Sequence, residues 1–260
     1  MRTEALVLRT VDFGESDLVV HLLTPDAGRI GAIAKGARRS VKRFAGSLDV
    51  LNRVRIELAV RRRPGTLARL EQARLVHHHP GLRRRADRFA LAGWLAELLD
   101  RMAPEGNAAH EAAALYGFAL RTLALLEEAE PDARLRVLLE LRALDALGLR
   151  PELARCVRCG GEPAAFHVPE GGPVCRACGM RVDGLLPVRR GTLRTLEHAL
   201  RLEPDRLGRL RLSGRALAEA RELVHRFARF HVGLELRSEP VLDALGLGVG
   251  EQLGQRHGYS

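Results

Sequence analysis

The chain has 260 residues, enough for one large domain or for two to three small ones, each with its own hydrophobic core. Hydrophobic residues make up 46% of it and charged residues 28%, which excludes a wholly disordered chain. The charge balance is unusual, because 42 basic side chains outnumber 32 acidic ones and leave a net charge of +10. We therefore expect an anionic partner.

Charged residues are spread through the first twenty positions, and no run of eighteen apolar residues occurs in the chain. A signal peptide needs an uncharged apolar core, and a membrane-spanning helix needs about twenty mostly apolar residues. The sequence therefore predicts neither, and we expect a cytoplasmic protein with no membrane partner.

The first 80 residues predict a small β domain with an excess of positive charge. Val54, Ile56, Leu58 and Val60 alternate with polar residues, which is the period of a strand with one buried face. Other apolar runs and turn residues bring the expected strands to five, over about residues 3–11, 18–23, 29–34, 53–61 and 66–76. Five short strands fit a closed barrel such as an OB-fold. Fifteen basic and eight acidic side chains give this domain a net charge of +7.

A nine-residue segment after the third expected strand holds five cations and no acid. Such a loop can neutralise phosphates along a nucleic-acid backbone, although its charge alone fits a solvated loop equally well. Arginines on one face of the fourth expected strand favour the first interpretation, because an OB-fold binds nucleic acid in a basic groove. The candidate DNA-binding residues are Lys35, Arg38, Arg39, Lys42, Arg43, Arg53, Arg55 and Arg61.

Side chains on which bases could stack are scarce in this domain. Phe13 and Phe44 are the only Phe, Tyr or Trp residues among the first 80. We therefore expect binding to be mainly electrostatic and tolerant of base sequence.

From about residue 81 the apolar residues recur with the period of helices. Leu91, Leu95 and Leu98 share one helix face, and two more helices are expected over about residues 108–128 and 131–147. A last long helix follows Ser213, which is a suitable N-cap. Arg189 and Arg190, just before the last helical region, are further candidates for the anion-binding surface.

Four cysteines occur in two pairs, with two residues inside each pair and fifteen between the pairs: Cys156, Cys159, Cys175 and Cys178. This spacing is typical of a four-cysteine zinc site, with an iron–sulfur site or two redox dithiols as alternatives. Gly160 and Gly179 follow the pairs, where we expect tight turns. Four protein ligands leave no open position on zinc, so the sequence predicts one structural zinc ion and not a catalytic one.

Together these patterns predict an α+β protein. We expect an N-terminal five-stranded OB-fold barrel over residues 1–80 and a helical bundle domain over residues 81–150 and 189–245. The four-cysteine zinc element, residues 151–188, is expected to be inserted between the two parts of the helical domain. Residues 246–260 are expected to form a flexible tail. Nucleotide-binding glycine motifs and the H-E-x-x-H motif are absent, so we do not expect an enzyme.

Several segments together resemble the RecO family of bacterial recombination mediators. Residues 11–17, 22–28, 34–39 and 43–44 are similar, in order and spacing, to the N-terminal OB domain of that family. The cysteine pairs and the segment Phe227–Ser238 are similar to its zinc element and final helix. The resemblance covers roughly residues 1 to 245.

This resemblance implies a function. RecO-like proteins bind single- and double-stranded DNA, anneal complementary strands, and with RecR help RecA replace single-stranded-DNA-binding protein. The resemblance thus implies DNA, RecR and the acidic C-terminal tail of single-stranded-DNA-binding protein as partners, RecA as an indirect one, and a place at the nucleoid. The tail would dock on the helical domain, at an arginine cluster beside apolar surface.

Two alternatives stay open at this point. The basic surface fits an interaction scaffold that recognises acidic protein tails, with DNA contact incidental. A zinc hydrolase is the third possibility, and it would require an open coordination position on the metal.

Overall fold

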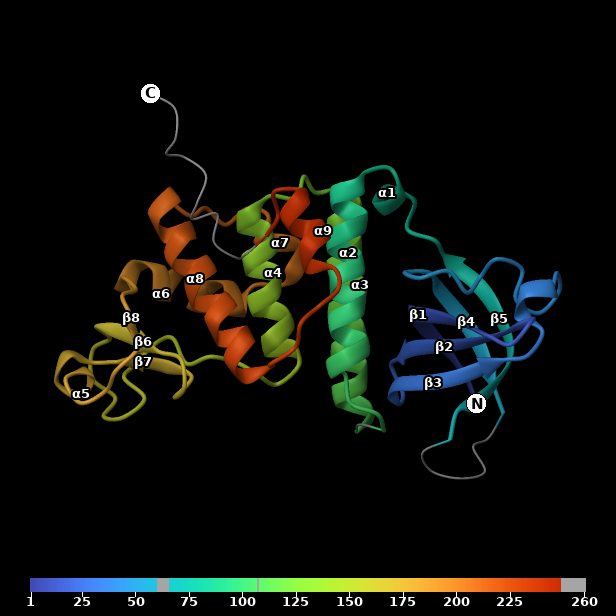
Figure 1. The fold of residues 1–260 in the computed structure, drawn as a ribbon, viewed down its shortest axis with the longest axis horizontal. Coiled ribbons are helices and arrows are strands. Elements are labelled where there is room, and N and C mark those ends of the chain that lie inside the picture. Colours follow the sequence, from blue (N-terminus) through green and yellow to red (C-terminus); the bar gives the residue numbers. More distant parts are fainter. Residues whose placement is uncertain (60–65, 107, 249–260) are drawn as a thin grey trace. The chain divides into compact units, whose positions relative to one another are not determined.

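The computed structural model describes residues 1–59, 66–106 and 108–248 of the chain. These residues form two compact units (Figure 1), the first made of residues 1–130 with 236–238 and the second of residues 131–235 with those from Glu239 onward. This division places the helices before residue 130 with the barrel, whereas we expected them in a domain with the later helices. The boundaries expected at residues 80 and 150 stay predictions. Most of the expected flexible tail, from residue 249, lies outside the described residues.

The first unit begins with a closed five-stranded barrel whose strand order is β1-β2-β3-β5-β4. Strands β3 and β5 pair in parallel, and the other neighbours pair antiparallel. The strands are β1 (Arg2–Phe13), β2 (Asp17–Thr24), β3 (Gly28–Ala34), β4 (Arg53–Leu58) and β5 (Ala68–His77). This order and closure confirm the expected OB-like barrel.

The predicted alternation on the fourth strand is also confirmed. Val54, Ile56 and Leu58 are buried in the barrel core, whereas Arg55 on the opposite face is exposed. Val60, at the end of the same pattern, lies outside the described residues. This segment therefore forms a barrel strand with one buried face and one solvent-exposed face.

Strand β1 departs from simple alternation, because four consecutive residues, 5–8, are all buried. Ala5 and Val7 point into the barrel core, so Leu6 and Leu8 point outward and are covered from outside. The cover consists of α2 (Ala86–Met102) and α3 (Ala109–Glu128), which follow the short α1 (Pro80–Arg83) and contact β1, β2 and β3.

A buried carboxylate fixes α2 on the barrel. The side chain of Asp100 is only 6% exposed, and its Oδ1 lies 2.5 Å from His21 Nδ1 on β2 and 3.9 Å from Arg29 Nη1 on β3. Arg29 also donates from its Nε to the backbone oxygen of Ala103 at 3.2 Å. The outer face of β1–β3 is thus closed by apolar contact and by compensated charge.

The second unit is a helical bundle with the cysteine segment inserted into it. Helices α4, α6 and α8 contact one another, and the Oγ of Ser213 accepts a hydrogen bond from Ala216 N at 3.2 Å, as expected of an N-cap. The helices are α4 (Ala133–Ala146), α6 (Arg190–Arg201), α7 (Pro204–Leu207), α8 (Gly214–His231) and α9 (Glu239–Ala244). Among the helices of the described residues, none is both long and apolar enough to cross a membrane.

The cysteine segment lies between α4 and α6 in the chain, as expected. It contains a three-stranded sheet and one short helix: β6 (Ala165–His167), β7 (Gly172–Val174), α5 (Arg176–Gly179) and β8 (Leu185–Leu186), with β6 central. It packs on α8, because His231 Nε2 lies 2.8 Å from the backbone oxygen of Val168 and the Phe166 and Phe227 rings are 6.5 Å apart. The metal-ligand candidates therefore sit on a segment that is supported by a long helix.

Candidate functional site

The basic loop, residues 35–43, leaves β3 and is held against the turn between β1 and β2. Gly36 adopts a φ of +66°, which favours glycine, and its N–H donates to Asp17 Oδ1 at 2.7 Å. The N–H of Arg38 donates to the backbone oxygen of Ser16 at 3.1 Å. The start of the loop is therefore fixed by hydrogen bonds to the adjacent turn.

The five cations of the basic loop have two different roles. Lys35, Arg38, Arg39 and Lys42 are exposed. Arg43 is half-buried, donates from Nη2 to the backbone oxygen of Lys35 at 2.6 Å, and has its guanidinium carbon 5.1 Å from the centroid of the adjacent Phe44 ring. Arg43 therefore braces the loop, and four cations face solvent.

Two of the exposed arginines have weak carboxylate neighbours. Arg38 Nη1 lies 3.6 Å from Asp12 Oδ2, and Arg39 Nη2 lies 3.8 Å from Glu15 Oε2. All four side chains are largely exposed, and exposed ion pairs of this kind contribute at most about 1 kcal/mol. A phosphate can therefore replace either carboxylate at small cost.

Arg53 and Arg55 share a carboxylate partner, unlike the exposed cations of the basic loop. Arg53 Nε lies 2.8 Å from Glu4 Oε2 and Arg55 Nη2 lies 3.4 Å from Glu4 Oε1. The hydrogen bond to Glu4 raises the pKa of Arg53. The end of the basic loop lies beside this part of the sheet, because Ala73 N on β5 donates to Arg43 O at 2.9 Å and Ala73 pairs with Ile56, next to Arg55 on β4. Arg61 lies outside the described residues, and DNA contact by these three arginines stays a prediction.

Exposed apolar side chains accompany the basic loop. Phe13, at the end of β1, is 56% exposed, and Val41, inside the loop, is 84% exposed. Phe44 is buried in the barrel core and is not available to bases. Sequence periodicity gave no signal for this difference, because both phenylalanines lie at or beyond strand ends.

The four cysteines form one cluster in the second unit. Their Sγ atoms all lie within 4.8 Å of one another, and those of Cys159 and Cys175 are 3.6 Å apart. Zinc–sulfur bonds of 2.3 Å in a tetrahedron place sulfurs about 3.8 Å apart. The cluster therefore has the dimensions of a four-thiolate metal site.

The two glycines after the cysteine pairs serve different needs. Gly160 has a φ of +72° and its N–H donates to Cys156 O at 2.8 Å, which confirms the expected tight turn. Gly179 closes the same kind of turn, because its N–H donates to Cys175 O at 2.8 Å, but it does so within α5 and without a positive φ. A Cβ at Gly179 would lie 3.2 Å from Leu185 Cδ1, so this position needs a small residue for packing.

The thiols oppose one another's ionisation, which favours a bound cation. Burial disfavours the Cys156 thiolate, but backbone N–H groups of Cys175, Arg158 and Cys159 lower the pKa of Cys156 to about 6. Interactions with Cys175 and Cys159 raise the pKa of Cys178 to about 12. A metal ion removes this conflict because its charge stabilises all four thiolates, so the donor set fits a metal.

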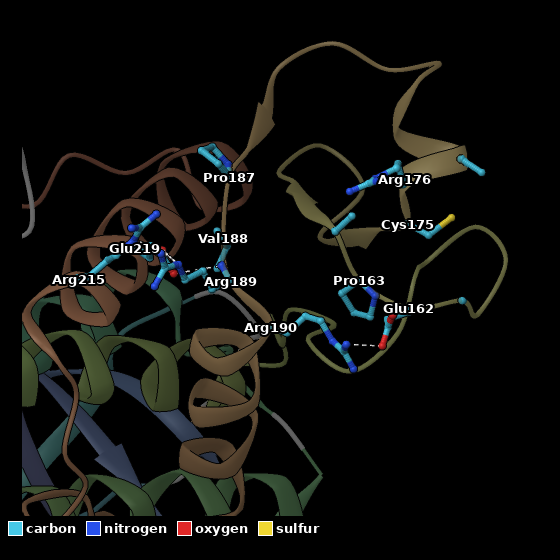
Figure 2. Close-up of a pocket in the computed structure, with 13 residues that line it drawn as sticks. Glu162, Pro163, Cys175, Arg176, Pro187, Val188, Arg189, Arg190, Arg215 and Glu219 are labelled. Carbon is cyan, nitrogen blue, oxygen red and sulfur yellow. Dashed lines mark hydrogen bonds and ion pairs between the residues drawn. The ribbon is translucent and has the colours of Figure 1, made fainter.

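A pocket of about 800 Å³ lies beside the cysteine cluster (Figure 2). Four arginines and two glutamates line it together with apolar side chains: Arg176, Arg189, Arg190, Arg215, Glu162, Glu219, Pro163, Pro187 and Val188. Figure 2 shows Arg190 facing Glu162, and Glu219 near Arg189 and Arg215. The pocket thus combines an excess of positive charge with apolar walls.

Comparison with known proteins assigns both parts of the chain to one family. A family model described as "Recombination protein O N terminal" matches residues 1–79, and one described as "Recombination protein O C terminal" matches residues 83–240. The chain belongs to the RecO family. The basic loop lies in the region matched by the N-terminal model, and the cysteine cluster lies in the region matched by the C-terminal one.

Individual RecO relatives are similar over nearly their whole length. The DNA repair protein RecO of Anaeromyxobacter dehalogenans strain 2CP-C is 37% identical over 254 residues, which is 95% of this chain and 97% of that protein. The protein of the same name from Syntrophus aciditrophicus strain SB is 32% identical over 251 residues, 94% of this chain and 95% of the relative. That of Symbiobacterium thermophilum is 33% identical over 250 residues, 93% of this chain and 96% of the relative. The resemblance drawn from the sequence motifs is therefore confirmed.

The anchoring of the basic loop in this RecO chain can be tested at Asp17. We expect Asp17→Ala to expose the Gly36 amide and to destabilise the loop by about 1.5–3 kcal/mol, because the hydrogen bond is to a charged acceptor. Amide hydrogen exchange measures this as lost protection at Gly36. Asp49→Ala, which removes an exposed carboxylate, should leave that protection unchanged, and equal protection in both variants would contradict the assigned anchor.

Proposed function

We propose that the protein is a DNA-binding recombination mediator in DNA repair and not an enzyme. On this proposal it binds single- and double-stranded DNA, anneals complementary strands, and with RecR promotes RecA loading onto DNA coated with single-stranded-DNA-binding protein. The observation that supports it most is the basic loop, in which four exposed cations are held on an OB-like barrel by a fixed backbone. Membership of the RecO family, whose relatives are named DNA repair proteins, supports it further.

The loop chemistry suits annealing. Lys35, Arg38, Arg39 and Lys42 can neutralise phosphates on strands of any sequence, which lowers the repulsion between two polyanions without nucleotide hydrolysis. Phe13 and Val41 offer apolar surface beside these cations, where an unstacked base can rest. Such a surface holds strands while leaving their base edges free to pair.

The DNA path we propose runs over the loop end of the barrel. An OB-fold commonly binds oligonucleotides on the face of strands 2 and 3, but here α2 and α3 contact the outer side of those strands. The exposed cations of the basic loop lie next to the β1–β2 turn, away from this cover. Arg53 and Arg55, which share Glu4, would extend this surface along β4, and Arg61 stays a predicted contact outside the described residues.

We further propose that the cysteine cluster holds one structural zinc ion. Cys156, Cys159, Cys175 and Cys178 would supply all four ligands, and the bound ion would tie the two cysteine pairs together. The support is the mutual distance of the sulfurs and the conflict between their charges. A complete sulfur shell leaves no position for water, which favours a structural ion over a hydrolytic one.

For the partners, we propose that the pocket of Figure 2 receives the acidic C-terminal tail of single-stranded-DNA-binding protein. Its arginines beside prolines and a valine suit a segment that carries both carboxylates and an apolar side chain. RecR as a direct partner, RecA as an indirect one, and a cytoplasmic, nucleoid-associated location rest on the family resemblance. The same pocket also supports the alternative function, an interaction scaffold that recognises acidic protein tails.

The contribution of the basic loop can be measured from the salt dependence of binding to single-stranded DNA. Four engaged cations predict that log affinity falls against log salt with a slope of about −2.8, at roughly −0.7 per phosphate. Arg38→Ala with Arg39→Ala should make the slope shallower by about 1.4. Fluorescence anisotropy with a labelled oligonucleotide measures it. Arg226→Ala with Arg229→Ala removes the same charge from α8 and should change the slope less; equal changes would count against the loop.

The zinc proposal predicts that Cys175→Ser releases the metal from the cysteine cluster. Because the ion ties the two pairs together, residues 151–188 should then exchange amide hydrogens faster, while the barrel changes less. Metal analysis and hydrogen exchange measure the two effects. Met180→Ser, at an exposed side chain of the same segment, should keep the zinc. Bound iron, or no metal at the cysteines of the parent protein, would rule the proposal out.

The mediator and the scaffold differ in which surface binds which ligand. A labelled oligonucleotide and a labelled acidic peptide with an apolar end are titrated separately. We expect Arg38→Ala with Arg39→Ala to weaken oligonucleotide binding by at least tenfold and peptide binding little, and Arg176→Ala with Arg215→Ala to do the reverse. Tight peptide binding that depends on the loop, together with weak DNA binding, would favour the scaffold.

A further inference from the structure

Two histidines and a glutamate of the first unit converge outside the sites described above. The segment His77–Pro80 has the sequence of a polar linker, and residues 77 and 79 of an extended chain share a face while 78 points away. His77 ends β5, and Glu127 lies in the last turn of α3. Both histidine rings reach the same carboxylate oxygen of Glu127.

The ligand atoms are at metal-binding distances from one another. His77 Nε2 lies 3.0 Å and His79 Nδ1 lies 3.2 Å from Glu127 Oε2, and the three atoms fit within 4.8 Å. Metal–nitrogen and metal–oxygen bonds of about 2.0–2.1 Å in a tetrahedron place ligand atoms about 3.3 Å apart. An ion can therefore bind between them after small ring movements.

The surrounding backbone holds these groups in place. The second oxygen of Glu127, Oε1, accepts a hydrogen bond from Gly81 N at 3.0 Å, which orients the carboxylate. A Cβ at Gly81 would lie 2.6 Å from the backbone oxygen of Glu127, so only glycine allows this approach. His79 has a left-handed backbone, with φ of 48° and ψ of 65°, a strained conformation for a residue with a side chain.

The two histidine rings differ in burial, and this difference leaves one side of the ligand set open to solvent. The His79 side chain is 6% exposed and that of Glu127 is 18% exposed, whereas that of His77 is 44% exposed. An ion can enter past His77, and three protein ligands leave a position for water. Two imidazoles and one carboxylate suit divalent transition metals such as zinc.

We propose that His77, His79 and Glu127 form a second metal site, separate from the cysteine cluster. The bound ion links the end of β5 to the end of α3 and so fastens the barrel to the helices that cover it. The site takes a divalent transition-metal ion from the zinc class, and it does not depend on the function proposed above.

The test titrates the metal-free full chain with Zn²⁺ and, separately, with Co²⁺. We expect two bound equivalents, of which one gives the sulfur-to-metal charge-transfer absorption of Co²⁺ bound to thiolates and the other gives none. Glu127→Gln and His77→Asn should each remove only the second equivalent. His78→Ala is the matched control, because it removes a neighbouring imidazole that does not reach Glu127, and it should keep both equivalents.

Thermal unfolding separates a metal site from a hydrogen-bonded histidine pair. Zn²⁺ should raise the Tm of the Cys175→Ser chain, and this rise should vanish in the Cys175→Ser chain that also carries His77→Asn. A single equivalent in the parent chain, held by sulfur alone, would overturn the proposal. So would loss of the second equivalent in His78→Ala to the same degree as in His77→Asn, with circular dichroism showing each variant folded.

Discussion

The packing of α2 and α3 on the outer face of β1–β3 determines which surfaces of the first unit remain accessible to a binding partner. Leu6, Leu8 and Leu23 are buried although they do not point into the barrel core, and Asp100 carries a charge into this contact. Removing the partners of such a buried carboxylate costs about 3–5 kcal/mol, so His21 and the arginines near it hold the helices in one place. The usual oligonucleotide face of the barrel is therefore closed, and the loop end remains.

The net charge of the barrel does not identify the DNA-binding surface that we propose. Whether each arginine has a carboxylate partner nearby is more informative. Most arginines of the barrel have a carboxylate in reach: Arg53 and Arg55 share Glu4, and Arg29 has Asp100 and Glu105. The basic loop differs because its acidic neighbours are exposed and distant enough to be exchanged. On the proposed function, this exchange of weak carboxylate contacts for phosphates is the chemistry of binding.

Local sequence patterns predicted the elements well but not the long-range contacts between them. Alternation on β4 and the cysteine spacing are local signals, and the structure confirms the barrel and the cluster. The bracing role of Arg43, the pairing of Arg53 with Glu4, and the meeting of His77 with Glu127 depend on strand register and helix packing across many residues. No single-chain periodicity encodes such contacts. Helix α6 is a different case, because Leu193, Leu196 and Leu200 recur at helical spacing and are all buried, so a local pattern for a separate helix was present in the sequence.

A hydrogen-exchange footprint of the full chain, with and without single-stranded DNA, tests directly whether the basic loop is the surface that binds DNA. We expect slower exchange in the basic loop, in the β1–β2 turn at residues 14–16 and at Asp17, where hydrogen bonds join the two segments. We expect no change on β2 and β3 where α2 and α3 cover them. Protection confined to the second unit, or to the outer face of β4 and β5 with the basic loop unchanged, would contradict DNA binding by the basic loop.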